Sequence, residues 1–271
     1  MMTPSYLLTL VFVIVLAGSP HLAAPHQHVA SETSCDAKDW IGRAEEVESL
    51  LADADIVSVE DIGMGVTLPK RVRMQAAEAT LGGAFKDIKR GRQGGFWESY
   101  QAEVAAYALD RMLGLDMVPP TIVRRVEKNR GSLQYWVNDC KLYRDVQSRT
   151  PGTPQWSNQL SRMKMFDILI NNADRNAQNF LVDPHFHIVL IDHSRAFTTS
   201  KSMMRDEKKL PSQYDRALVE RLEHIERPAL DEIMDGLLLG NQVEAIVRRR
   251  DFILEHVQQL VTEKGADKVF F

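Results

Sequence analysis

The sequence predicts an α+β protein in which a small antiparallel sheet comes first and a mainly helical part follows. Three strand-like runs lie between Ile56 and Ile88, and three segments with helical apolar periodicity lie between Pro211 and Lys264. Between these regions, Phe166 to Phe197 combines a helix end, two short apolar strands and polar residues at their ends. With 271 residues, 44% hydrophobic and 26% charged, the chain suits one globular unit of two lobes.

The N-terminal stretch differs from the rest of the chain. Tyr6 to Leu16 is an apolar run of eleven residues, too short to span a bilayer comfortably, and small or helix-breaking residues follow it up to Pro20. This is typical of a secretory signal peptide, here about residues 1–24, with residues 1–35 forming signal peptide and linker. Because MMTPS carries no Lys or Arg, an uncleaved N-terminal anchor is the alternative. We expect a secreted or periplasmic protein with no stable membrane span after cleavage.

Charge and cysteine content add little about partners. The formal net charge of −4 gives no overall attraction to nucleic acid or anionic lipid, so no nucleic-acid partner is expected. The two cysteines, Cys35 and Cys140, form one disulfide or leave Cys140 as a buried thiol.

The first lobe is expected to begin with a helix and continue as a sheet. A helix from Asp36 is indicated by one apolar stripe of Trp40, Ala44, Val47, Leu51 and Ala54. The runs IVSVEDIGMGV, RVRMQA and GGAFKDI then predict strands, and the last of them contains Lys86. Gly63 and Gly65 predict a hairpin whose backbone N–H groups lie close to phosphates, although the third glycine of G-x-G-x-x-G is absent.

A basic loop and a helix follow the sheet. Residues 89–95, KRGRQGG, are predicted to be a flexible, solvated loop. Phe96 to Leu113 is predicted to be a helix that ends at Gly114 and carries Glu103.

The next segments complete the predicted element order. Thr121 to Val126 and Ser132 to Val137 predict a strand pair around a turn at residues 128–131, with Trp136 and Val137 as candidates to line an adenine pocket. Further helices are predicted at residues 157–171, 211–225, 227–239 and 242–264. In the last helix, residues 248–250, RRR, are expected to lie on the surface.

Three polar residues in the central stretch have a spacing that fits phosphoryl transfer. Asp174 is followed five positions later by Asn179 and eighteen positions later by Asp192. Asp183-Pro184-His185 supplies a turn between the two short strands NFLV and IVLI, so the three polar residues lie at the ends of rigid elements. Phosphoryl transfer requires one carboxylate to orient a hydroxyl, and an amide oxygen with a second carboxylate to hold a cation. Asp174 or Asn179 alone would more often be a turn or helix-end residue.

The sequence pattern N-x-D-R-x-x-x-N, followed by I-D-x-x-x-A-F, resembles the motifs of the atypical kinase-like superfamily. Its members include type II phosphatidylinositol 4-kinases, four-jointed-type secretory kinases and bacterial HipA-like kinases, and the resemblance implies a phosphatidylinositol 3/4-kinase-like protein. The stretch from Glu103, EVAAYALDRMLGLDMVPPT, resembles the secretory and bacterial members. The resemblance implies a bilobal protein-kinase-like fold, with a small antiparallel-sheet N-lobe over residues 36–138 and a mainly helical C-lobe over residues 139–271.

The resemblance also implies roles for individual residues. Asp174, with the adjoining Arg175, would orient or deprotonate the acceptor. Asn179 and Asp192 would hold Mg²⁺ or Mn²⁺ on ATP. Lys86 would contact the phosphates beneath Gly63 and Gly65, and Glu103 would hold Lys86. Glu98 is the fallback for Glu103.

The implied function is transfer of the γ-phosphoryl group of ATP to a hydroxyl acceptor on a protein, sugar or lipid. Asp192-His193-Ser194 lacks the glycine of D-F-G, which leaves metal binding intact but removes the basis for a regulatory loop flip. The alternatives are a catalytically inactive kinase fold that serves as a binding module, and AMP transfer on the same fold.

Overall fold

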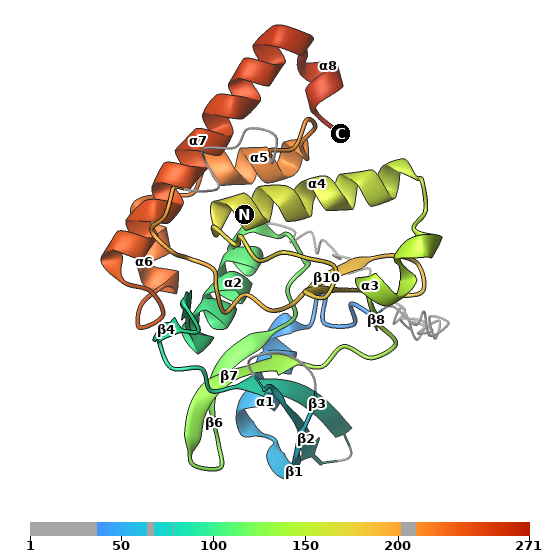
Figure 1. Ribbon diagram of the computed structural model, residues 1–271, viewed down its shortest axis with the longest axis vertical. Coiled ribbons are helices and arrows are strands. Elements are labelled where there is room, and N and C mark those ends of the chain that lie inside the picture. The colour runs from blue at the N-terminus through green and yellow to red at the C-terminus, as the bar shows by residue number, and fades with distance from the viewer. Residues whose placement is uncertain (1–36, 64–67, 78, 202–209) are drawn as a thin grey trace, which may run out of the picture. The chain divides into compact units, whose positions relative to one another are not determined.

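The computed structural model describes residues 37–63, 68–77, 79–201 and 210–271 (Figure 1). The signal peptide predicted around residues 1–24, together with Cys35 and Gly65, lies outside the described residues. The strands are β1 (Asp55–Asp61), β2 (Lys70–Ala76), β3 (Ala79–Lys86), β4 (Gly91–Gln93), β5 (Phe96–Glu98), β6 (Thr121–Val126), β7 (Asn129–Tyr135), β8 (Lys141–Leu142), β9 (Phe180–Val182) and β10 (Ile188–Leu190). The helices are α1 (Ala44–Asp53), α2 (Tyr100–Leu113), α3 (Tyr143–Val146), η1 (Gln147–Arg149), α4 (Pro154–Leu169), α5 (Arg216–Glu223), α6 (Arg227–Ile233), α7 (Gly240–Lys264) and α8 (Ala266–Val269).

The predicted α+β architecture is confirmed: an antiparallel sheet occupies the N-terminal region and helices dominate the C-terminal part. The main sheet has the strand order β1-β2-β3-β7-β6. The turn between β6 and β7 was predicted at residues 128–131, and this is wrong because Val126 pairs directly with Asn129. Glu127 adopts a left-handed φ of 53° and closes a tighter turn, so Gly131 lies inside β7 instead.

The first helix begins later than its apolar stripe predicted. Residues 37–42 form turns, and α1 begins only at Ala44 because Gly42 has a left-handed φ of 79° that a helix does not accommodate. Val47 and Leu51 are buried on α1. Trp40, on the turns before it, belongs to the same buried cluster as the sheet residues.

A hairpin of β4 and β5 replaces the basic loop predicted at residues 89–95 and the first residues of the helix predicted over Phe96 to Leu113. Gln93 pairs with Phe96, which leaves Gly94 and Gly95 as the turn, with φ values of 55° and 89°. Two successive positive φ angles define the hairpin turn that Gly-Gly favours. The helix α2 begins only at Tyr100, after Ser99, whose side chain accepts a hydrogen bond from the Gln101 backbone N–H.

Helix α2 connects the two regions of the fold. It contacts β6 and β7 of the sheet and also α5 and α6 of the helical part (Figure 1). It ends at Gly114, which has a left-handed φ of 55°. Leu109 and Leu113 belong to the buried cluster of the helical part, whereas Phe85 and Leu133 belong to that of the sheet. The predicted boundary between the N-lobe and the C-lobe, between residues 138 and 139, stays a prediction.

In the C-terminal part, β9 and β10 form the predicted hairpin. Its turn is held by Asp183, whose Oδ1 accepts hydrogen bonds from the N–H groups of His185 and His187 at 2.9 and 2.7 Å. The helix predicted from residue 211 begins instead at Arg216, because the Asp215 side chain accepts the Leu218 N–H and thereby sets the start.

Arg249 contradicts the prediction that residues 248–250 lie on the surface, since it is only 1% exposed. Its Nε donates to the carbonyl oxygen of Leu169 at 2.7 Å, and its Nη1 donates to that of Thr198 at 3.1 Å. Leu169 is the last residue of α4, where unpaired carbonyl oxygens favour a cation. Burial lowers the pKa of Arg249 to about 9. Arg249 therefore joins α7 to the end of α4.

Among the described residues, no helix combines the length and apolar character needed to cross a membrane.

Candidate active site

Lys86 is the last residue of β3 and its ammonium group lies between two carboxylates. Its Nζ is 2.5 Å from Glu103 Oε1, on α2, and 2.8 Å from Asp192 Oδ1, after β10. The Lys86 side chain is 13% exposed, that of Glu103 3% and that of Asp192 34%. Burial alone would lower the pKa of Lys86, but the charges of Asp192 and Glu103 outweigh it and raise this pKa above its ordinary value. Lys86 is therefore a charged group that joins sheet, helix and hairpin.

Glu103 is the carboxylate that the sequence predicted as the partner of Lys86. Burial by itself would raise its pKa, yet the charge of Lys86, with support from His193, lowers the pKa below the ordinary range. The second oxygen, Oε2, accepts the backbone N–H of His193 at 2.9 Å. One carboxylate on α2 thus holds both Lys86 and the residue after Asp192.

Asp192 occupies a left-handed backbone conformation with a φ of 60°. Such a conformation is uncommon outside glycine and persists only where surrounding contacts fix it. One contact here is the hydrogen bond that Lys86 donates to the Asp192 carboxylate, and the other is the hydrogen bond that the backbone N–H of the next residue, His193, donates to Glu103. The imidazole of His193 is fully buried beside Phe166, and burial lowers its pKa.

Asp174 and Asn179 lie in a loop that is held by side-chain to backbone hydrogen bonds. The Asp174 carbonyl oxygen accepts from Asn179 Nδ2 at 2.8 Å and from Asn176 Nδ2 at 3.0 Å. The bond from Nδ2 fixes the orientation of the Asn179 amide. The Asn179 carbonyl oxygen accepts the backbone N–H of Ile191 at 3.4 Å, which places it beside the residue before Asp192. The Asp174 side chain itself is 41% exposed.

Arg175 lies behind this loop, and its side chain is 8% exposed. Its guanidinium donates to the Asp167 carboxylate through Nε and Nη2, with the shortest distances at 3.0 Å. Its Nη1 donates to the carbonyl oxygens of Asn179 and Ile191. Arg175 therefore joins α4 and the hairpin strands to the loop. Asp167 was not predicted as a site residue, although an acidic residue within the apolar run FDILI signals a buried partner.

Arg195 is a second residue that the sequence did not single out. Its Nε lies 2.7 Å from Glu98 Oε1, and its Nη1 lies 3.0 Å from Asp174 Oδ2. Its guanidinium also lies over the Phe96 ring, 4.1 Å from the centroid. Glu98, the fallback partner for Lys86, is thus engaged by Arg195.

The remaining predicted residues are Gly63 of the phosphate loop, and Trp136 and Val137 of the adenine pocket. Gly63 follows β1 with a left-handed φ of 69°, but the loop that continues through residues 64–67 lies outside the described residues. Val137 is buried in the cluster of the sheet. Trp136 stacks with Arg71, whose guanidinium is 3.5 Å from the ring centroid.

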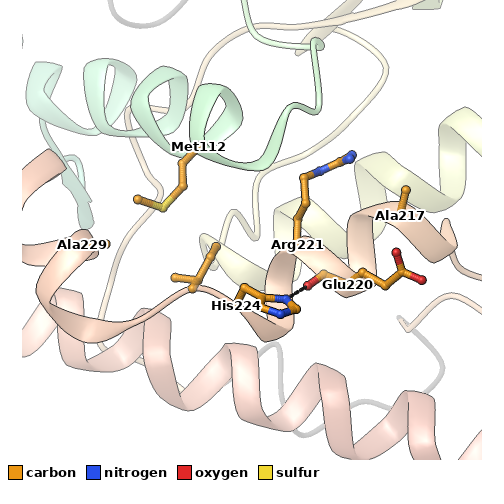
Figure 2. Close-up of a pocket in the computed structure, with 7 residues that line it drawn as sticks. Met112, Ala217, Glu220, Arg221, His224 and Ala229 are labelled. Carbon is orange, nitrogen blue, oxygen red and sulfur yellow. Dashed lines mark hydrogen bonds between the residues drawn. The ribbon is translucent and has the colours of Figure 1, made fainter.

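A pocket of about 400 Å³ lies elsewhere, between α2, α5 and α6 (Figure 2). Met112, Arg221 and His224 line it, and the His224 imidazole pairs with the carbonyl oxygen of Glu220. None of the predicted site residues belongs to its lining. The clustered charges around Lys86 are a better basis for chemistry than this pocket, because they bring a cation and acids together.

The strand-borne lysine, the helix-borne carboxylate and the Asp174 loop define a kinase-like protein, and solved structures of low identity share its fold. One is described as hydra Fam20 with sugar, with a TM-score of 0.64, 16% identity and coverage of 84% of this chain and 92% of that chain. Another, the Golgi casein kinase with Mn/ADP bound, has a TM-score of 0.62, 17% identity and coverage of 84% and 78%. The Helicobacter pylori proinflammatory kinase CtkA has a TM-score of 0.51, 12% identity and coverage of 79% and 98%.

The family follows from the sequence model for phosphatidylinositol 3- and 4-kinases, which matches residues 64–235. This match covers more than half of the chain, and the chain belongs to that family. No protein with a curated description matched.

The charge of Glu103 should make stability depend on pH. Its pKa is lower in the folded than in the unfolded chain, where it lies near 4.5, so its stabilisation is full above that pH and is lost as the pH falls further. Breaking a buried ion pair costs about 3–5 kcal/mol, and we expect Glu103→Gln to lie at the low end because Asp192 still pairs with Lys86. Urea unfolding at pH 7 should show this loss.

The difference between wild type and Glu103→Gln should narrow as the pH is lowered below 4.5. Glu46→Gln is the matched control, since Glu46 pairs with Arg43 at 2.8 Å on the surface and its loss should leave the free energy of unfolding nearly unchanged. If Glu103→Gln lowered the free energy of unfolding by no more than Glu46→Gln does, the stabilising role of the buried pair would be contradicted.

Proposed function

We propose that this protein is an ATP-dependent phosphotransferase that moves the γ-phosphoryl group of ATP to a hydroxyl acceptor. The observation that carries the proposal is the Lys86 ammonium group, held within 2.5 Å of Glu103 and 2.8 Å of Asp192. A buried, charged lysine fixed by a helix carboxylate is suited to bind phosphate oxygens. The fold and the family support the same reaction.

In this proposal, Asp174 orients the acceptor hydroxyl and accepts its proton. The carboxylate is partly exposed, as a group that must meet an incoming substrate has to be. The loop bonds from Asn176 and Asn179 to the Asp174 carbonyl oxygen fix the backbone from which this carboxylate extends. Arg175 serves as a positioning residue, because its donors hold the Asn179 and Ile191 carbonyl oxygens.

Asp192 and the Oδ1 of Asn179 are the proposed ligands for Mg²⁺ or Mn²⁺. Both offer the oxygen ligands that these cations prefer, and the partial exposure of Asp192 leaves room for further ligands from phosphate and water. Bound there, the cation would neutralise charge on the nucleotide phosphates. Mn/ADP in the Golgi casein kinase supports a divalent cation with ATP.

The acceptor class is best tested directly. The named relatives suggest a panel of dephosphorylated casein, a glycan with free hydroxyl groups, and phosphatidylinositol in vesicles. The protein would be incubated with each acceptor and γ-labelled ATP in the presence of Mg²⁺ or Mn²⁺. Metal-dependent labelling of one acceptor would identify its class. Release of ADP together with labelled inorganic phosphate, and with no labelled acceptor, would show transfer to water and would exclude the three acceptors of the panel.

We propose that the protein acts outside the cytoplasm. The support is the apolar run from Tyr6 to Leu16 and the fold shared with the Golgi casein kinase. The mature chain is expected to begin between Gly18 and Ser34. N-terminal sequencing of the native protein checks this, and Met1 or Met2 on cytoplasmic protein would rule it out.

Asp174→Asn keeps the side-chain shape and removes the charge. Positioned acid or base groups contribute about 10² to 10⁴ in rate, so we expect turnover to fall by a similar factor while ATP affinity and melting temperature change little. The matched control is Asp145→Asn, because Asp145 also pairs with an arginine, Arg144, at 3.2 Å. Retention of more than about a tenth of wild-type turnover by Asp174→Asn would exclude the assigned role.

Asp192→Ala removes the proposed carboxylate ligand of the cation. We expect calorimetry to show loss of the increment in ATP affinity that Mg²⁺ or Mn²⁺ gives the wild type. Affinity for ATP in EDTA should not fall, because Asp192 without its cation repels the phosphates. An unchanged metal-dependent increment would show that the cation is bound elsewhere.

A further inference from the structure

Arg195 joins the proposed catalytic carboxylate to a buried acid on another element. Its side chain is 21% exposed, and it donates to Glu98 at 2.7 Å and to Asp174 at 3.0 Å. The Phe96 ring covers the guanidinium at 4.1 Å. Hydrogen bonds to two carboxylates and stacking on an aromatic ring together fix the orientation of a guanidinium.

The Glu98 end of this chain of contacts is rigid. Glu98 is 4% exposed and is the last residue of β5. The next residue, Ser99, donates its backbone N–H to the carbonyl oxygen of Ser194 at 3.0 Å and caps α2. The start of α2 is therefore bound to the residue before Arg195. The same helix carries Glu103, which holds Lys86.

The Asp174 end is the one that needs support. The Asp174 side chain is 41% exposed, and the bonds that hold its loop engage the backbone carbonyl oxygen and leave the carboxylate to other partners. A solvated carboxylate samples several rotamers, and its ordering costs entropy. The contact with Arg195 engages only Oδ2, so Oδ1 is left to accept a hydrogen bond from an acceptor hydroxyl.

We propose that Arg195 is a positioning residue that sets the Asp174 carboxylate relative to the site of Lys86 and Glu103. The inference rests on the proposed phosphotransferase function and adds to it a residue that acts through Asp174. Because phosphoryl transfer depends largely on positioning, a carboxylate displaced by about 1 Å is expected to cost up to about 100-fold in rate. Through Glu98, the last residue of β5, the hairpin of β4 and β5 thereby helps to position the carboxylate that meets the acceptor hydroxyl.

The test compares two arginines that each bridge two carboxylates. Arg227 contacts Asp231 at 2.8 Å and Glu244 at 2.6 Å, far along the chain from the site residues. Arg195→Met and Arg227→Met would be assayed as full chains for release of inorganic phosphate from ATP with Mg²⁺ or Mn²⁺, with water as the acceptor probe. We expect Arg195→Met to lower kcat by about 10- to 100-fold with an unchanged KM for ATP, and Arg227→Met to keep wild-type kcat.

Two further variants separate positioning from a structural effect. Arg195→Lys should recover part of the lost kcat, since a lysine reaches one of the two carboxylates but does not form the same fork. In the background of Asp174→Asn, Arg195→Met should cause no further loss, because the residue acts through Asp174.

Three results would overturn the inference. They are wild-type kcat in Arg195→Met, an equal loss of kcat in the wild-type and Asp174→Asn backgrounds, and a rise in kcat, which would make the contact an inhibitory latch. A wild type that releases no phosphate from ATP and labels no acceptor would instead refute the proposed function itself.

Discussion

A buried ammonium group needs carboxylate partners, and this requirement at Lys86 determines how the parts of the fold meet. An unpaired lysine within the protein would lose its proton or destabilise the fold. Glu103 and Asp192 supply the two charges, and they come from α2 and from the segment after β10. The sheet, the helix and the hairpin are therefore held together at one point. Gly131 adds to this constraint, since a Cβ there would lie 2.2 Å from the Lys86 carbonyl oxygen.

The acidic residues of the site depend on partners that hold the backbone. Asp192 keeps a left-handed φ of 60° because the residue after it is bound to Glu103. The Asp174 loop keeps its shape because the side-chain amides of Asn176 and Asn179 donate hydrogen bonds to the Asp174 carbonyl oxygen. Arg175, behind the loop, donates to the carbonyl oxygen of Ile191. These contacts fix the backbone from which the acidic side chains extend, and a reaction that depends on positioning requires such support. The Asp174 carboxylate is the more exposed part of this loop, and Arg195 contacts it at 3.0 Å.

Local patterns predicted the strands of the main sheet and the 180–190 hairpin, because the hydrophobic period and the turn-forming residues that specify them are adjacent in the sequence. The spacing of Asp174, Asn179 and Asp192 is likewise a local feature. The adjacent glycines Gly94 and Gly95 are also a local signal for a turn, but the basic residues around them led to the prediction of a solvated loop. Long-range contacts had no such signal. The partners of Arg195 lie 97 and 21 residues away. Arg249 is buried because backbone carbonyl oxygens accept hydrogen bonds from its guanidinium, and sequence periodicity carries no signal for such partners.

In the proposed function, the charges around Lys86 serve transfer of the terminal phosphoryl group of ATP. The most direct test uses ATP that carries one phosphorus isotope at the γ position and another at the α position, together with Mn²⁺ and an acceptor that the protein labels. Mass and isotope analysis of the labelled acceptor then shows which part of the nucleotide moved. The account predicts the γ isotope alone on the acceptor, with ADP as the second product. An acceptor that carries the α isotope, with release of pyrophosphate, would contradict it and identify AMP transfer.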